Sequence, residues 1–343
     1  MMVSMFGALV WAVLSGTAAG TEFGGGVTMV VQGSSGAPDD TGAASASIDF
    51  EVEHPLSKSL ALYLHVEAGP GTGLDVGTLS GINEDADGDA SLRITEFNLK
   101  WGADRFELLC GMLDASAVLD ANAFAGDETG QFLASAFVHN PAVEFPDNAF
   151  GLALVLKAGK GFTFRLCGCE ADADWQDSFD RPFGAVEVEY ALGEKGTVRL
   201  CGWVNGEERA THDGSGSRMP SGVGLSADLK AGQAGLFVRV GMSDGEVCET
   251  DLSGSLGLVW RAKTWPEGDA LGFAVGVSRR SDEFVESNPG TPDAAEIQIE
   301  LFYRRRASER FALLPDLQLV LNPDGDEDAD PIVVFGLRSQ VSF

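Results

Sequence analysis

Apolar and polar side chains alternate one by one along most of the chain, and this period of two predicts β-strands. Over residues 48–53, Ile48, Phe50 and Val52 alternate with three acidic residues. Residues 60–67 repeat the pattern, with three leucines and a valine at every second position. An amphipathic helix would instead place its apolar residues three or four positions apart. The pattern therefore favours one strand after another.

Sixteen segments carry this alternation, at about residues 24–32, 44–54, 60–68, 92–101, 105–113, 150–157, 162–170, 182–190, 196–204, 221–230, 234–243, 251–260, 270–278, 294–305, 311–320 and 331–343. Outer-membrane barrels have an even number of strands, short periplasmic turns and longer external loops. The predicted connections alternate in the same way, with 244–250 the one external loop no longer than the longest turn. We therefore expect an all-β fold, a transmembrane antiparallel β-barrel of about sixteen strands.

The two ends of the chain fit export to an outer membrane. Residues 1–20 form one apolar run that ends in small residues, which is typical of a signal peptide. We therefore expect a cleaved segment at 1–20 and a mature barrel over 21–343. The last strand alternates to a terminal Phe343, the form that barrel-assembly machinery recognises. After residue 20, no run of about eighteen apolar residues could form a membrane-spanning helix.

The distribution of charge indicates that the two ends of the predicted barrel differ. The formal net charge is −29, and the predicted external loops hold 32 acidic and 5 basic residues. So acidic a chain is not expected to bind nucleic acid. Its four histidines stand beside no recognisable serine motif, so we expect a channel and not an enzyme.

Two acidic tracts, 85–89 and 324–330, have an oxygen-rich spacing that could suit Ca²⁺ on external loops. Neither fits a complete calcium loop, so solvated acidic loops are the better interpretation and we expect no cofactor and no metal.

The five cysteines are odd in number and lack the spacing of a zinc site, and the sequence does not assign disulfide pairs.

A barrel of this strand number encloses an aqueous channel, so the inward side chains are the candidate substrate path. The inward polar positions carry both charges and are predicted at Arg165, Arg199, Arg239, Glu96, Glu187, Asp228, Glu300, Arg304, Asp316 and Gln318. Four inward aromatics, Tyr63, Trp203, Phe237 and Phe302, could stack on the apolar faces of sugars. The alternative is that these rings pack beneath an inserted loop.

The longest predicted loop, 114–149, follows the fifth strand, and we expect it to fold into the lumen and constrict the pore. It carries no Lys or Arg, and its acids are Asp114, Asp120, Asp127, Glu128, Glu144 and Asp147. One hypothesis is that Arg165, Arg199 and Arg239 form a basic ladder that faces these acids across the narrowest point. The other is that wall acids, such as Glu187 and Asp228, neutralise the ladder locally.

Two groups of residues resemble the carbohydrate-selective porins of the OprB family. One runs from Glu300–Arg304 through Leu314–Pro323 to Phe335–Arg338, and the other from Gly111–Asp114 through the third loop to Asn140 and Pro141. The resemblance implies a sixteen-stranded barrel in the bacterial outer membrane and diffusion of sugars. We therefore expect a porin for saccharides and other small polar solutes, surrounded by outer-membrane lipid and assembled either alone or as a homotrimer. A general cation-preferring porin and a structural or adhesive barrel remain the alternatives.

Overall fold

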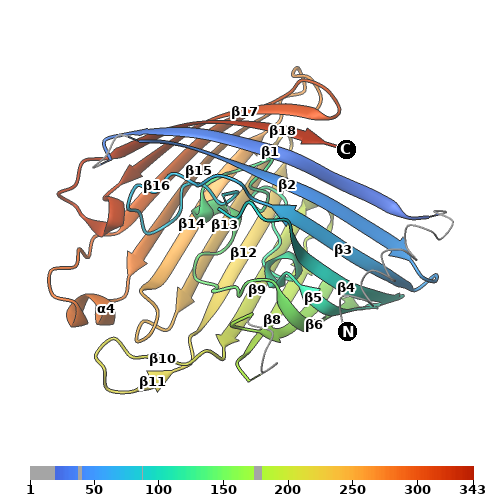
Figure 1. Ribbon diagram of the computed structural model, residues 1–343, viewed down its shortest axis with the longest axis horizontal. Coiled ribbons are helices and arrows are strands. Elements are labelled where there is room, and N and C mark those ends of the chain that lie inside the picture. The colour runs from blue at the N-terminus through green and yellow to red at the C-terminus, as the bar shows by residue number, and fades with distance from the viewer. Residues whose placement is uncertain (1–19, 38–40, 87, 174–179) are drawn as a thin grey trace.

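The computed structural model describes residues 20–37, 41–86, 88–173 and 180–343, and these form a single closed β-barrel (Figure 1). The barrel strands are β1 (Glu22–Ser35), β2 (Gly42–Pro55), β3 (Leu60–Ala68), β4 (Arg93–Ala103), β5 (Phe106–Leu113), β6 (Ala149–Gly159), β7 (Phe162–Glu170), β8 (Pro182–Ala191), β9 (Gly196–Asn205), β12 (Ser221–Ala231), β13 (Ala234–Ser243), β14 (Thr250–Trp260), β15 (Ala270–Arg280), β16 (Glu296–Arg306), β17 (Phe311–Leu321) and β18 (Ile332–Ser342). Each predicted strand is confirmed, with both ends within three residues of the predicted ones.

Every neighbouring pair in the barrel is antiparallel, and the first and last strands close it. β1 pairs with β18 in a register that sets Thr28 opposite Gln340 and Val30 opposite Arg338. Figure 1 shows this seam, where the blue first strand lies beside the red last strand. Closure leaves no free strand edge, whose backbone N–H and C=O groups would find no hydrogen-bond partner in lipid. The predicted signal peptide lies outside the described residues, apart from Gly20.

The period-two pattern places apolar side chains on the outer surface of the wall. Leu200 and Leu256 are 56% and 61% exposed, whereas the inward Ser226 and Gln318 are 2% and 0% exposed. An outer apolar band is what the hydrocarbon of a membrane requires of a barrel. No helix in the described ranges is long and apolar enough to cross a membrane.

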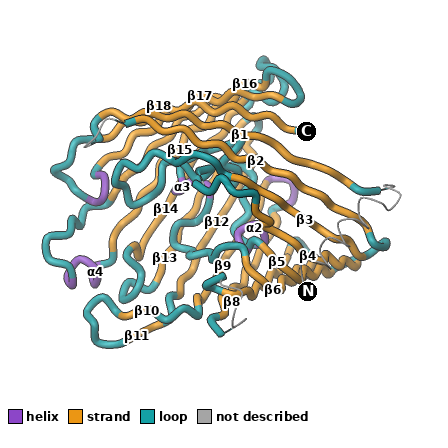
Figure 2. Tube along the Cα trace, viewed as in Figure 1, coloured by secondary structure: helices purple, strands orange, loops and turns teal. Residues whose placement is uncertain are grey.

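Five short strands and α-helices in the described external loops were not predicted. β10 (Arg209–Ala210) and β11 (Ser217–Arg218) form a small hairpin beyond the barrel, and α4 (Asp282–Ser287) lies in the loop after β15. Two single-turn helices, α2 (Ala115–Val118) and α3 (Ser135–Val138), lie within the third loop (Figure 2). Segments of this length carry too little periodicity to be recognised in a sequence.

Candidate pore and constriction

The third loop, 114–149, folds into the barrel, and Arg239 of β13 is one of its main anchors. Arg239 is 0% exposed, and its Nε lies 3.1 Å from Oδ2 of Asp120. Its two terminal nitrogens donate to the loop carbonyls of Phe137 (2.7 Å) and Asp120 (3.1 Å). The predicted inward fold of this loop is therefore confirmed.

A second anchor binds the loop backbone to the C-terminal strands of the wall. The carboxylate of Glu300 accepts hydrogen bonds from the N–H groups of Leu133 and Ala134, at 2.7 and 2.9 Å. Arg338 donates to the carbonyls of Glu128 and Gln131, at 2.5 and 2.6 Å. These bonds satisfy backbone groups that have no strand partner inside the barrel.

Apolar packing completes the attachment of the loop. Phe132 is fully buried and its ring lies 5.4 Å from Phe137, 5.4 Å from Phe237 and 4.9 Å from Phe302, measured between centroids. Trp203 donates its Nε1–H to the carbonyl of Ala142 at 3.0 Å. Phe237, Phe302 and Trp203 therefore pack beneath the inserted loop, which was the alternative to sugar stacking.

Tyr63 is the one inward aromatic of the four that stays partly open. It is half-buried on β3, and Nζ of Lys100 lies 3.9 Å from the centre of its ring. Lys100 also pairs with Glu53 at 3.0 Å. Both contacts lie on the side of the barrel that the third loop leaves open.

The basic ladder does not face the loop acids as a unit. Arg165 pairs with Glu187 and Glu189, at 3.0 and 2.9 Å, and Arg199 pairs with Glu189 and Asp228, at 3.1 and 2.6 Å. Only the third arginine of the ladder reaches a loop carboxylate. Adjacent strands place these wall residues within direct reach of one another, so local neutralisation prevails over a field across the lumen.

The six loop acids also serve different purposes. Asp120 is buried, and besides Arg239 it accepts from the N–H of Asn140 at 2.7 Å. Asp114 caps α2 through Ser116, and Asp127 accepts from Thr129 and Gly130 within its own turn.

The other three loop acids lie along the route. Glu144 pairs with Arg209 at 2.9 Å, while Asp147 lines the external mouth. Glu128 lines the open space inside the barrel.

The second external loop, 69–91, also folds inward, which the sequence analysis did not predict. Glu296 of β16 accepts from the N–H groups of Leu79 and Ser80, at 2.8 and 3.0 Å. Gln318 of β17 donates to the carbonyl of Ile82 at 2.9 Å. The loop thus crosses the lumen from β3 to the C-terminal strands. Its buried Leu74, Val76 and Ile82 were the signal in the sequence, since a solvated external loop has no need of them.

The two inserted loops meet each other at Glu84 and Ser135. The N–H of Glu84 donates to the carbonyl of Leu133 (2.9 Å), the N–H of Ser135 donates to the carbonyl of Gly81 (3.0 Å), and the hydroxyl of Ser135 donates to the Glu84 carboxylate. Backbone bonds in both directions join the loops as strands of a sheet are joined. Glu84 is nevertheless an exposed residue, so its carboxylate remains open to the lumen.

Three cavities follow one another along the side of the barrel that the loops leave free. The external cavity has a volume of about 540 Å³ and the inner cavity about 370 Å³, and Glu84 lines both. A third cavity of about 650 Å³ opens among the turns that join β2 to β3 and β4 to β5. Glu84 therefore lies between the external mouth and the inner cavity.

Comparisons with known proteins agree with this architecture. Residues 194–343 match the family described as "Carbohydrate-selective porin, OprB family". OprB of Pseudomonas putida, in its high-pH structure, is 16% identical with a TM-score of 0.81, covering 98% of this chain and 97% of that one. Residues 194–343 thus resemble the OprB family, and the whole chain has the fold of a porin. It shares the closed sixteen-strand barrel of that protein, and its place is the outer membrane.

Other known proteins share the fold of this chain or part of its sequence. The channel DcaP of Acinetobacter baumannii has a TM-score of 0.62 at 13% identity, over 94% of this chain and 97% of that one. The anion-selective porin of Comamonas acidovorans has a TM-score of 0.61 at 12% identity, over 94% and 99%. An "uncharacterized protein" of Aquifex aeolicus is 30% identical over 86 residues, which is 25% of this chain and 28% of that protein. The resembling residues around the third loop lie outside the matched range 194–343.

The remaining predicted wall residues of the porin lie around the inserted loops. Glu96 accepts a long hydrogen bond of 3.4 Å from the N–H of Asp114, and Arg304 lies beside Gly130. Asp316 is 5% exposed and accepts from Gln318 at 3.1 Å. Glu96 and Arg304 thus contact the third loop, whereas Asp316 supports Gln318, which binds the second loop.

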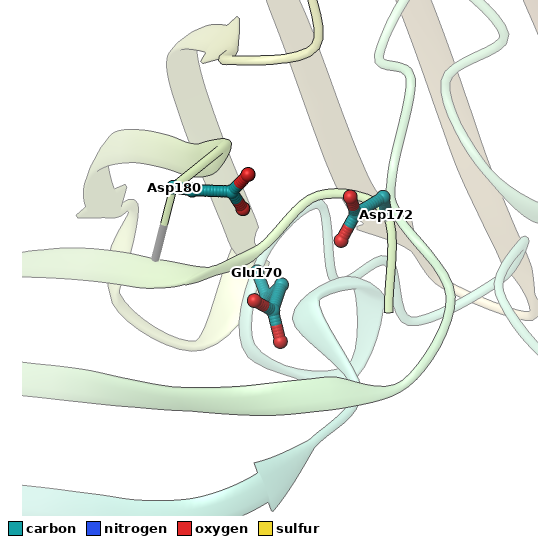
Figure 3. A group of neighbouring side chains, drawn as sticks. All are labelled: Glu170, Asp172 and Asp180. Carbon is teal, nitrogen blue, oxygen red and sulfur yellow. The ribbon is translucent and has the colours of Figure 1, made fainter. Parts of the chain in front are cut away.

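The metal candidates from the sequence do not form ligand groups in the described residues. Asp85 lies against Ser47 inside the barrel, and Asp324 pairs with Arg280. The group that does come together is Glu170, Asp172 and Asp180, whose carboxylate oxygens lie within 4.8 Å of one another (Figure 3). Arg181 already contacts Asp172 at 3.1 Å. The group is therefore partly neutralised without an ion.

All five cysteines of the porin are free. Cys167 and Cys201 lie on β7 and β9, and β8 runs intact between them, so they cannot bond. Cys167, Cys169 and Cys201 are buried in the apolar cluster beneath the third loop. Free cysteine packs there as a small hydrophobic residue.

Proposed function

We propose that this porin carries saccharides of about one ring, together with other small polar solutes, by passive diffusion across the outer membrane. The observation that supports it best is the run of cavities on one side of the lumen, joined at Glu84. An inner volume of about 370 Å³ suits a hexose and its closest waters.

The lining of the inner cavity supports hydroxylated solutes. Hydroxyl groups come from Thr28, Ser47, Thr129 and Ser342, and carboxylates stand between them. Carboxylates accept strong hydrogen bonds from sugar hydroxyls, and the hydroxyl side chains can both donate and accept. A sugar can therefore exchange its water for wall contacts as it passes.

A cation-preferring general porin is the second candidate, because acids outnumber bases on the open route. Six carboxylates and one histidine line the inner cavity.

We also propose that export removes a signal peptide near residue 20, that barrel-assembly machinery inserts the chain, and that its oligomeric state is a monomer or a trimer. Solvent-exposed wall leucines would then face lipid or a neighbouring barrel.

Liposome swelling with neutral sugars of increasing size tests the leading proposal. We expect fast swelling with pentoses and hexoses and slow swelling with trisaccharides. Liposomes with heat-denatured protein are the control. Reversal potentials in a potassium chloride gradient, measured in parallel, test the second candidate. Strong cation selectivity with no size preference among the sugars would favour it, and no conductance at all would leave a structural or adhesive barrel.

A further inference from the structure

The inner cavity is unusual in the charge of the side chains that line it, which is negative. Its carboxylates come from two strands and both inserted loops: Asp49, Glu51, Glu67, Glu84, Asp85 and Glu128. Among the described residues, no lysine or arginine lines it, and His65 already contacts Asp49 at 3.2 Å. Four arginines of the wall are occupied elsewhere, holding the third loop and its neighbouring strands: Arg165, Arg199, Arg239 and Arg338.

Asp85 is the group in this lining that most needs a partner. Its side chain is 6% exposed, and Oδ1 accepts from the hydroxyl of Ser47 at 2.7 Å. Its other oxygen, Oδ2, has no hydrogen-bond partner in the described part of the chain. A buried carboxylate oxygen without a donor carries an uncompensated desolvation penalty, which a cationic donor would relieve.

We propose that the inner cavity is a subsite for a small polyhydroxylated cation, that is, an aliphatic ammonium group carried on a sugar-sized polyol. The ammonium binds at Asp85 and Glu128, and the hydroxyls bind the remaining carboxylates and the serine and threonine hydroxyls of the wall. This proposal rests on the porin function above and narrows its substrate class. It adds a preference for positive charge to a preference for hydroxyl groups.

The spacing of the carboxylates favours an organic cation over a bare metal ion. In the described residues, no three ligand groups of this cavity come within 4.8 Å of one another. A divalent ion needs several oxygens at about 2.0–2.6 Å from one point. An extended polyol with one ammonium group instead contacts carboxylates spread along a cavity of about 370 Å³.

Three probes with the same six-carbon polyol chain isolate the effect of charge: sorbitol is neutral, N-methylglucamine is cationic and gluconate is anionic. Each is added to one side of a planar bilayer that holds the full-length porin at pH 8, and block of the potassium current is measured. We expect half-block by N-methylglucamine at about one tenth of the sorbitol concentration, the size of one hydrogen bond to a charged group. Gluconate should be the weakest of the three.

The variant Asp85→Asn with Glu128→Gln tests whether this cavity is responsible. It should bring N-methylglucamine and sorbitol to similar concentrations while the conductance persists. The matched control is Asp282→Asn with Glu286→Gln, which removes the same charge from the exposed helix α4. Its N-methylglucamine preference should equal that of the wild type.

The outcomes separate the two proposals. Equal block by the three polyols in the wild type, or a preference that survives in the cavity variant, overturns the cationic subsite while leaving the porin intact. A preference lost equally in the α4 control assigns it to the general charge of the mouth and also overturns the subsite. Wild-type liposomes that admit no sorbitol overturn the porin function itself.

Discussion

Arg239 and Asp120 form an ion pair inside the barrel, with 3.1 Å between Nε and Oδ2 and side chains only 0% and 4% exposed. The arginine belongs to β13 and the aspartate to the third loop. Because the pair is shielded from water, removing one partner leaves a buried charge with no compensation. The position of the constricting loop therefore depends on this contact more than on any exposed pair.

We expect Arg239→Ala to destabilise the docked loop by about 3–5 kcal/mol and to raise the single-channel conductance. The thermal transition of the barrel on gels and planar-bilayer recordings measure the two effects. Arg218→Ala is the control, since Arg218 is 50% exposed in its pair with Asp244 and such pairs contribute about 0–1 kcal/mol. The double change Arg239→Ala and Asp120→Ala should be milder than the sum of its parts. Equal behaviour of the two arginine variants would contradict this role.

Phe132→Ala should loosen the third loop without removing any of its polar anchors. Phe132 is 0% exposed and packs on Phe237 and Phe302, so the truncation leaves a cavity and a cost of about 3–5 kcal/mol. We expect noisier single-channel currents and faster proteolysis within the loop. Phe132→Leu keeps most of the side-chain volume. Its current noise and its rate of proteolysis should therefore lie between those of the wild type and those of Phe132→Ala. Quiet wild-type currents from Phe132→Ala would mean that the polar anchors alone hold the loop.

The barrel itself was predictable because its signal is local. Each strand in lipid must alternate apolar and polar side chains, and this alternation is written into consecutive residues such as Ile48, Asp49 and Phe50. The same local rule predicted which side chains point inward. Antiparallel pairing of neighbours in sequence then set the order of the wall.

The constriction was less predictable because it depends on contacts between distant residues. All six acids of the third loop look alike in the sequence, yet only Asp120 pairs with an arginine of the barrel wall and only Glu128 lines the inner cavity. The docking partner of Leu79 and Ser80 is Glu296, more than 200 positions away. No periodicity encodes such a pairing, so the inward fold of the second loop and the place of Glu84 were missed.

Leu225→Arg tests the assignment of the outer face. Leu225 is 39% exposed on the lipid side of β12, and arginine near the midplane costs about 2–4 kcal/mol. We expect less folded protein in lipid vesicles. Glu51→Arg is the control, since Glu51 lies in the inner cavity and should insert normally. Equal insertion of the Leu225 and Glu51 variants would mean that the faces are wrongly assigned.

The selectivity of the pore should depend on pH between about 4 and 8. Burial raises the pKa of Asp85 from 3.8 to about 7, although the Ser47 hydrogen bond opposes the shift. Burial likewise raises the pKa of Glu128 to about 7. The stabilisation of the docked loops by protonated Asp85 is therefore complete below about pH 3.8 and is lost as the pH rises through about 7. Over the same range the cavity gains negative charge.

We therefore expect the cation-to-anion permeability ratio to rise as the pH increases from 5 to 8, with the steepest change near the pKa of about 7 shared by Asp85 and Glu128. Reversal potentials in a salt gradient measure it. The groups facing these two carboxylates are Asp49, Glu67, Glu84, Asp127 and Arg338. In Asp85→Asn with Glu128→Gln, the change near pH 7 should disappear while any change near pH 4, from the other acids, remains. A wild-type profile that stays flat between pH 6 and 8, or one that the double variant leaves unchanged, would place the titrating charge elsewhere on the route.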